Sequence, residues 1–230
     1  MNPAMVPRLT AEVAGTAMLV FFGVGGLITS GQAFIGAIAF LAAAAVSVWI
    51  FGGHFNPWIT LAVAIKGSVG WLRAGLIILA QLVGGIIGAL LLWAVLGGEG
   101  AARGLGATHL PQEAIDGGNS ALIRVILAEA IAVFLLCCAV FAAGDGINGG
   151  ISMGLAYAAG IMAISVVSAA SLNFARSLGP ETVLLFAADT PDWAGFGRLW
   201  VYAVSGILGA ALAGLLYPVW RPAARGPVTG

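Results

Sequence analysis

The sequence carries very little charge. Only 8% of its residues are charged, nine of each sign, so the formal net charge is zero. Soluble domains average about a quarter charged residues, and a chain this poor in charge cannot cover a surface that faces water. A net charge of zero also argues against nucleic-acid binding, because phosphate recognition needs a basic patch. We therefore expect lipid as the solvent and no nucleic-acid partner.

Groups that carry catalysis or bind metals are also scarce. The two cysteines, Cys137 and Cys138, are adjacent in one apolar run, and neighbours on a helix point apart, so neither a disulfide nor a metal site is expected. The sequence shows no carboxylate pair or phosphate-binding loop, and GVGG at 23–26 lacks the strand-then-helix context of a dinucleotide site. We expect no enzyme activity, no cofactor and no metal ion.

Long apolar runs are what the chain has in abundance. Hydrophobic residues make up 61% of it, and its 35 glycines favour helices that pack closely in a membrane. A transmembrane helix needs about 20 predominantly apolar residues. Five more runs follow the first, which is therefore interpreted as a retained span rather than a cleaved signal. These features predict an all-α integral membrane protein with six transmembrane helices, near residues 9–29, 33–51, 74–96, 121–143, 151–170 and 199–220.

Two pairs of polar residues recur at the same spacing. Glu12 and Glu129 are 117 residues apart, and so are Asn56 and Asn173, which indicates a duplicated chain. Each half holds three spans, so the halves must have opposite orientations in the bilayer, as in inverted-repeat transporters and channels. We assign one membrane domain, 1–230, with a first repeat at 8–96, a connecting loop at 97–120, a second repeat at 121–220 and a cytoplasmic tail at 221–230.

Two polar segments, 56–66 and 173–183, are too short to span a bilayer and are predicted to be re-entrant half-helices. Asparagine is a strong N-cap, and Pro57 follows Asn56 at the first helical position, where its missing N–H costs nothing. Two facing helix N-termini would place positive partial charge and asparagine donors at mid-membrane, which disfavours cations and admits water or a small alcohol. The alternative is that Asn56 and Asn173 are helix caps without solute contact.

Five segments carry a family resemblance: AEVAGT at 11–16, GGHFNPWITLA at 52–62, AQLVGGIIGALLL at 80–92, AEA at 128–130 and NFARSLGPE at 173–181. In them the chain is similar to the aquaporin, or major intrinsic protein, family, whose pattern is two Asn-Pro-Ala boxes, the second followed by arginine. The resemblance implies a homotetramer with a pore in each subunit. It also implies that buried Glu12 and Glu129 hold the re-entrant loops by accepting backbone N–H bonds. We interpret His54 as a hydrogen-bonded structural residue that supports the first loop.

Both boxes depart from the family pattern. The expected pore midplane consists of Asn56, Pro57 and Trp58 in the first box and Asn173, Phe174 and Ala175 in the second. Phe174 can still open a helix, because an N–H in the first turn has no helical partner. An indole and a phenyl ring would overpack a junction built for small residues. Either the rings turn outward and the pore is open, which we expect, or the pore narrows.

The resemblance implies a second constriction, nearer the outer face and built from four positions. Arg176 matches the fixed arginine, and counting back from the second box places Ala170 and Ile161 at two others. The fourth is Phe40 if a gap of four residues precedes GGHFNP and Gly36 if there is none. We prefer Phe40, because Gly36 would leave too little chain for the first span and its turn.

The solute preference follows from this constriction. It is wider and more apolar than the Phe-His-Thr-Arg set of strict water channels, which favours glycerol, but Ser177 replaces the aspartate of typical glycerol facilitators. We expect a passive channel for water first and for glycerol or other small neutral solutes second, closed to protons and ions. The alternatives are a pore-blocked, non-conducting protein and, with less support, an ion-coupled transporter. For Arg176 itself, the alternative is that it pairs with a loop acid such as Glu181 and has no further role.

Basic residues set the expected orientation. With both termini cytoplasmic, the inner side holds Arg8, Lys66, Arg73, Arg221 and Arg225. The acidic residues of the loops then lie mostly outside. We expect the chain in the cell membrane with both termini in the cytoplasm.

Overall fold

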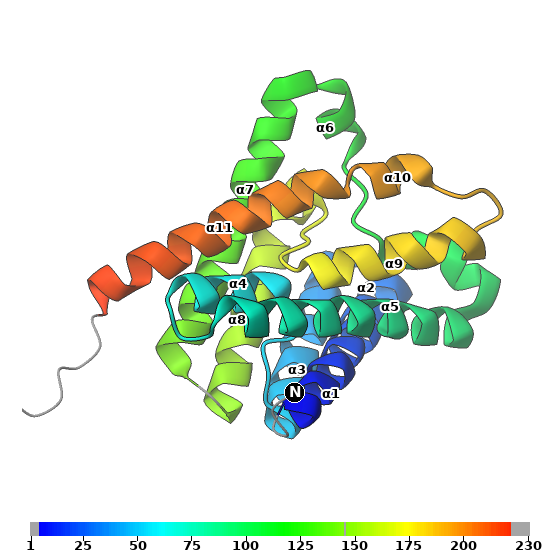
Figure 1. Ribbon diagram of the computed structural model, residues 1–230. Coiled ribbons are helices and arrows are strands. Elements are labelled where there is room, and N and C mark those ends of the chain that lie inside the picture. The colour runs from blue at the N-terminus through cyan, green and yellow to red at the C-terminus, as the bar shows by residue number, and fades with distance from the viewer. Residues whose placement is uncertain (1–4, 145, 222–230) are drawn as a thin grey trace, which may run out of the picture.

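The computed structural model describes residues 5–144 and 146–221, and every regular element in these ranges is a helix (Figure 1). The predicted all-α class is confirmed. Arg225 and the part of the predicted tail beyond Arg221 lie outside the described residues. The elements are α1 Met5–Met18, η1 Leu19–Val24, α2 Gly25–Ser30, α3 Ala33–Phe51, α4 Pro57–Ile65, α5 Trp71–Ala102, η2 Gly104–Gly106, α6 Gln112–Asp116, α7 Gly118–Ala143, α8 Ile147–Ser168, α9 Phe174–Ala187, α10 Trp193–Gly197 and α11 Leu199–Trp220.

Within the described residues, six segments are long and apolar enough to cross a membrane, as predicted. The first joins α1, the π-helical turn η1 and α2 into one span. α5 continues beyond the predicted end of the third span, but Gly97 has φ 60° and ψ −150°, so the regular helix ends at Leu96. The six segments are Met5–Ser30, Ala33–Phe51, Trp71–Ala102, Gly118–Ala143, Gly146–Ser168 and Trp193–Trp220.

Two shorter helices, α4 and α9, begin directly after the two asparagines. The side-chain oxygen of Asn56 accepts a hydrogen bond from the backbone N–H of Trp58 at 2.9 Å. That of Asn173 accepts one from Ala175 at 3.0 Å. Both asparagines have extended backbone, and the helix starts at the next residue, which is the geometry of an N-cap. α9 runs past residue 183 to Ala187, because an apolar run continues the helix.

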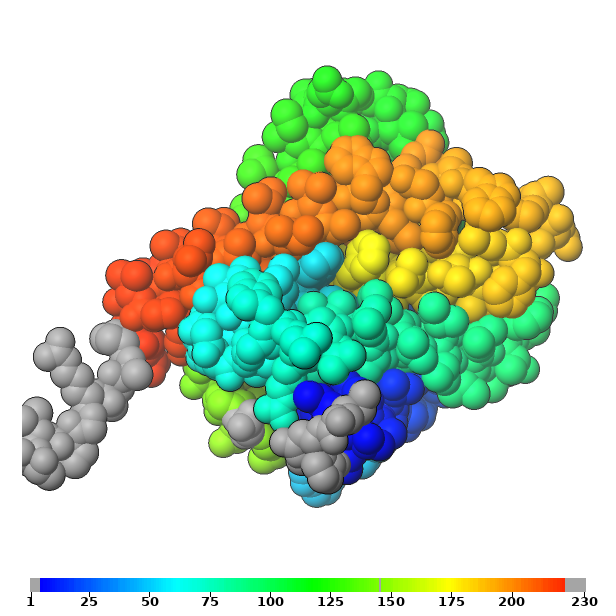
Figure 2. Space-filling model, in the orientation of Figure 1, coloured from blue at the N-terminus to red at the C-terminus, as the bar shows by residue number. Residues whose placement is uncertain are grey.

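The two predicted repeats interlock through α4 and α9. α1 packs on α5 in the first repeat, and α7 packs on α11 in the second. The third span of each repeat also packs against the half-helix of the other, α5 against α9 and α11 against α4. α3 lies against α8. Figure 2 shows α4 and α9 between α5 and α11 on one face of the molecule. Equivalent contacts thus occur twice, as an inverted repeat requires.

Glycine allows α9 to approach α5 closely. A Cβ atom added to Gly85 would overlap the backbone carbonyl of Ala175, and one added to Gly179 would overlap the carbonyl of Gly85. Backbone atoms cannot move aside as the end of a flexible side chain can, so a larger residue fits neither position. This contact fixes where α9, and with it Asn173, lies.

We expect Gly85→Ala to destabilise the protein although alanine is the better helix former. The added methyl group would push α9 away from α5, and such overpacking costs about 1–3 kcal/mol. Gly75→Ala on the same helix is the control, because nothing lies within 4 Å of its added atom, and it should be neutral or slightly stabilising. Thermal unfolding in detergent compares the two variants, and equal midpoints would contradict the close packing.

Candidate functional site

Glu12 holds the loop before α4. Its carboxylate, fully buried, accepts hydrogen bonds from the backbone N–H groups of His54 at 3.0 Å and Phe55 at 2.9 Å. Gln81 of α5 donates to the same carboxylate at 2.8 Å, and Arg8 forms an ion pair with it at 2.9 Å. The loop that carries Asn56 is therefore tied to the first and third spans.

Glu129 does the same for the loop before α9. It accepts hydrogen bonds from the backbone N–H groups of Ser171 at 2.8 Å and Leu172 at 3.0 Å. The hydroxyl of Ser168 donates to it at 2.7 Å. The two glutamates thus bind equivalent pairs of consecutive N–H groups, each pair just before an asparagine.

The two asparagines meet at the centre of the protein. The side-chain amide of Asn56 donates to the carbonyl of Leu172 at 2.9 Å, and that of Asn173 donates to the carbonyl of Phe55 at 2.9 Å. Each amide therefore bonds the backbone of the opposite loop. Both asparagines are fully buried. One N–H of each amide remains for a further partner.

That partner is the hydroxyl of Tyr157, a residue that the sequence analysis did not single out. Its oxygen accepts from Asn56 at 2.8 Å and from Asn173 at 3.0 Å, and its side chain is fully buried. The hydroxyl stands where a passing solute was expected. A signal was present in the sequence, since Tyr157 lies one helical turn before Ile161 and so on the same face of α8.

The two bulky box residues pack beside this junction. The rings of Trp58 and Phe174 have their centroids 5.7 Å apart. The indole lies directly on Gly206 of α11, where any side chain would overlap it. Trp58 therefore fills a space that a glycine on another span leaves, while the asparagine amides face Tyr157 of α8.

Arg176 is buried next to Phe40. Its side chain is 1% exposed, its Nη1 donates to the carbonyl of Gly106 at 2.9 Å, and its Cζ lies 5.7 Å from the centroid of the Phe40 ring. Gly36, the alternative to Phe40, instead packs against Leu27 of α2. The structure therefore brings Phe40, not Gly36, to the arginine.

The other two residues of the expected constriction are also buried. Ile161 is on α8, and Ala170 is in the loop before α9, where it adopts φ 51°. Among the described residues Arg176 forms no ion pair, so the pairing with Glu181 that the sequence left open is absent from this part of the chain.

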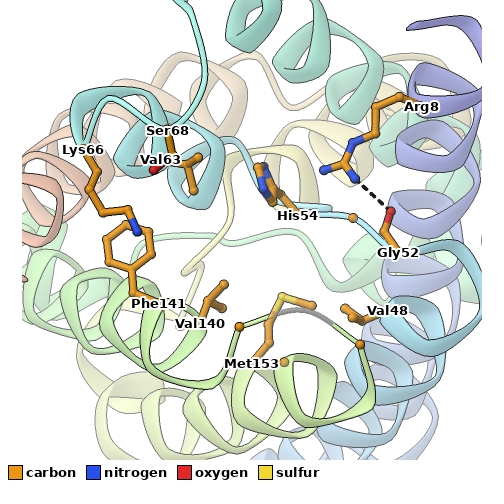
Figure 3. A pocket seen from close by; sticks show the side chains of 14 residues that line it. Arg8, Val48, Gly52, His54, Val63, Lys66, Ser68, Val140, Phe141 and Met153 are labelled. Atoms are coloured by element: carbon orange, nitrogen blue, oxygen red, sulfur yellow. Dashed lines mark hydrogen bonds between the residues drawn. The ribbon is translucent and has the colours of Figure 1, made fainter. Parts of the chain in front are cut away.

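A cavity of about 540 Å³ borders the loop that leads to Asn56, where Gly52 and His54 line it (Figure 3). Arg8 donates to the carbonyl of Gly52 at 3.2 Å at one side of it, and at the other Lys66 lies 4.5 Å above the ring of Phe141. His54 also lines the cavity, with its Nδ1 3.0 Å from the hydroxyl of Thr60. Two cationic side chains therefore stand at this cavity.

Two helix faces connect the cavity to the arginine. On α8, Met153 lines the cavity, Tyr157 bonds the asparagines and Ile161 follows, each one turn after the last. On α3, Val48 lines the cavity, and Phe40, two turns earlier, contacts both Arg176 and Tyr157. We interpret these stripes as the lining of a solute path, with Tyr157 at its middle.

Known proteins share this architecture. The family model described as major intrinsic protein matches residues 2–217. Aquaporin TIP4-4 of Zea mays is 33% identical over 233 residues, covering 92% of this chain and 85% of its own. Probable aquaporin TIP2-2 of Arabidopsis thaliana is 30% identical over 236 residues, covering 93% and 87%. The X-ray structure of the aquaglyceroporin from Plasmodium falciparum has the same fold, with a TM-score of 0.74, 17% identity and coverage of 93% and 95%. The chain belongs to the major intrinsic protein family.

Proposed function

We propose that the protein is a passive channel for water, with glycerol or other small neutral solutes as second permeants, closed to protons and other ions. One observation carries the proposal: the two asparagine amides converge on a single oxygen atom, that of Tyr157. A site built from two N–H donors at the positive ends of two helices binds a neutral oxygen and repels a cation. A water molecule presents the same acceptor as the tyrosine does.

Because of the same contact, displacement of the Tyr157 hydroxyl is the step that limits conduction. A permeating molecule has to take the place of the hydroxyl, because both free N–H groups of the asparagines already bond it. A pore-blocked, non-conducting protein is the second candidate, favoured by the full burial of this tyrosine. An ion-coupled transporter has less support, since the asparagine and tyrosine side chains at the junction carry no charge that could bind a proton or pair with an ion.

The proposal includes a homotetramer in the cell membrane with both termini in the cytoplasm and no enzyme activity. Large apolar side chains exposed on the spans, among them Trp49 at 70% and Val166 at 83%, support burial against lipid or another copy. Arg8 and Lys66 at the cavity support a cytoplasmic orientation for that face.

We expect Tyr157→Val to raise water permeability several-fold. The shorter side chain removes both the hydroxyl and the ring from the path and leaves one N–H of each asparagine for water. Light scattering by proteoliposomes that shrink in an osmotic gradient measures the rate against empty vesicles. Tyr217→Val is the control, because Tyr217 packs on Phe141 with ring centroids 5.2 Å apart and has no bond to either asparagine.

Trp58→Ala tests whether Tyr157 or the altered boxes obstruct the path. Since Trp58 packs over Gly206, its removal should lower stability without opening the path. Faster shrinkage in Trp58→Ala together with an unchanged rate in Tyr157→Val would locate the obstruction at the boxes. Rates equal to empty vesicles in the parent and in every variant would favour the non-conducting candidate.

We expect Ile161→His, made in the Tyr157→Val background, to reduce glycerol flux more than water flux. Histidine adds volume and a hydrogen-bond donor at the expected constriction, and the narrowing hinders glycerol, the larger solute, more than water. Parallel osmotic shrinkage in sorbitol and swelling in glycerol give both rates. An equal reduction of the two would place Ile161 off the path.

A further inference from the structure

A second polar cluster lies away from the asparagine junction and brings together three segments. His109 follows η2, Glu181 is on α9 and Asp192 precedes α10. The Nε2 atom of His109 is 3.5 Å from Oε1 of Glu181 and 3.2 Å from Oδ2 of Asp192. One ligand atom of each residue lies within 4.8 Å of the other two.

Glu181 is the unusual member of this cluster. Its side chain is fully buried, and neither carboxylate oxygen accepts a hydrogen bond from any described residue. Burial of an unpaired carboxylate is costly, and the buried Glu12 and Glu129 each accept at least three hydrogen bonds. The contrast indicates that Glu181 faces a partner that the protein chain itself does not supply.

The charge at Glu181 is correspondingly unfavourable. Two causes make it so: burial removes the water that would screen the carboxylate, and the carboxylate of Asp192 lies within 4.8 Å of it. A cation between the two carboxylates would offset both causes.

The donor atoms suit a divalent transition metal. Zinc binds imidazole nitrogen and carboxylate oxygen at about 2.0–2.2 Å, and a tetrahedral arrangement then sets the ligand atoms roughly 3.3 Å apart. The distances from His109 to its two neighbours are 3.5 and 3.2 Å. Two carboxylates and a neutral imidazole carry the charge that Zn²⁺ balances.

The cluster is also oriented and accessible. Oδ1 of Asp192 accepts from the backbone N–H of Gly195 at 2.7 Å, which leaves Oδ2 directed to His109. Such outer hydrogen bonds fix a ligand for a metal. The side chains of His109 and Asp192 are 45% and 39% exposed, so an ion and a fourth ligand from water reach the buried Glu181 between them.

We propose that His109, Glu181 and Asp192 form a binding site for Zn²⁺ or a similar divalent transition metal. The ion joins the loop that follows η2 to α9. Gly106, whose carbonyl accepts from Arg176, is the last residue of η2 and lies three residues before His109. Bound metal therefore holds the backbone that positions the arginine. This site does not depend on the proposed conduction of water.

Calorimetric titration of the untagged, detergent-solubilised protein with zinc chloride tests the site. We expect one ion per chain and an affinity at least ten-fold lower in His109→Gln and in Asp192→Asn. Asparagine at 192 keeps an oxygen to cap α10, so the fold is retained. Asp189→Asn, an exposed change in the same loop, is the matched control and should bind as the parent does.

A second measurement guards against variants that fold poorly. Zinc should raise the thermal midpoint of the parent and of Asp189→Asn, because a ligand that binds the folded state stabilises it, and should leave His109→Gln unchanged. Tetrahedral absorption of bound Co²⁺ reports the same site. The proposal is overturned by the absence of saturable binding in the parent, or by an affinity in His109→Gln within two-fold of the parent. Neither measurement requires water flux, so a non-conducting protein would not affect the result.

Discussion

Two buried carboxylates hold the centre of this protein together. Backbone at membrane depth has no water to bond, so its N–H groups need acceptors within the protein. Glu12 and Glu129 each accept two consecutive N–H groups from a re-entrant loop. Phe55 and Leu172, the second residue of each pair, adopt φ of 50° and 54°, a conformation that costs free energy outside glycine. The carboxylates stabilise it, and it directs the carbonyl of each residue to the opposite asparagine.

The fold follows from features that are local in sequence. Six apolar runs predict six spans, and an N-cap asparagine predicts where each half-helix begins, because both signals depend on neighbouring residues. The end of the third span was also predictable, since Gly97 interrupts α5 just beyond the apolar run. A duplication of the chain is also predicted without three-dimensional information, because Glu12 and Glu129 recur at the spacing of the asparagines.

The candidate site was harder to predict from the sequence, since its contacts join residues far apart in the chain. Trp58 fits because Gly206 on the last span leaves room for an indole, and no pattern near Trp58 shows this. The crossing of α3 and α8 brings the Tyr157 ring against Phe40 and places its hydroxyl between the asparagines. Composition marks this tyrosine only as one more residue of an apolar helix. The position of a side chain in a pore depends on helix packing, which the apolar runs alone do not determine.

Hydrogen bonding is not what keeps water from replacing the Tyr157 hydroxyl. An entering water molecule accepts the same two N–H bonds, each worth about 1 kcal/mol net, so the exchange nearly cancels. The obstacle is steric, because the ring is fully buried against Phe40 in an interior with few voids. Met153, one turn away on α8, borders the cavity of Figure 3. In the proposed channel, selectivity and conductance therefore rest on different residues: the asparagines select a neutral oxygen, and the packing of one tyrosine on α8 sets how often that oxygen belongs to water.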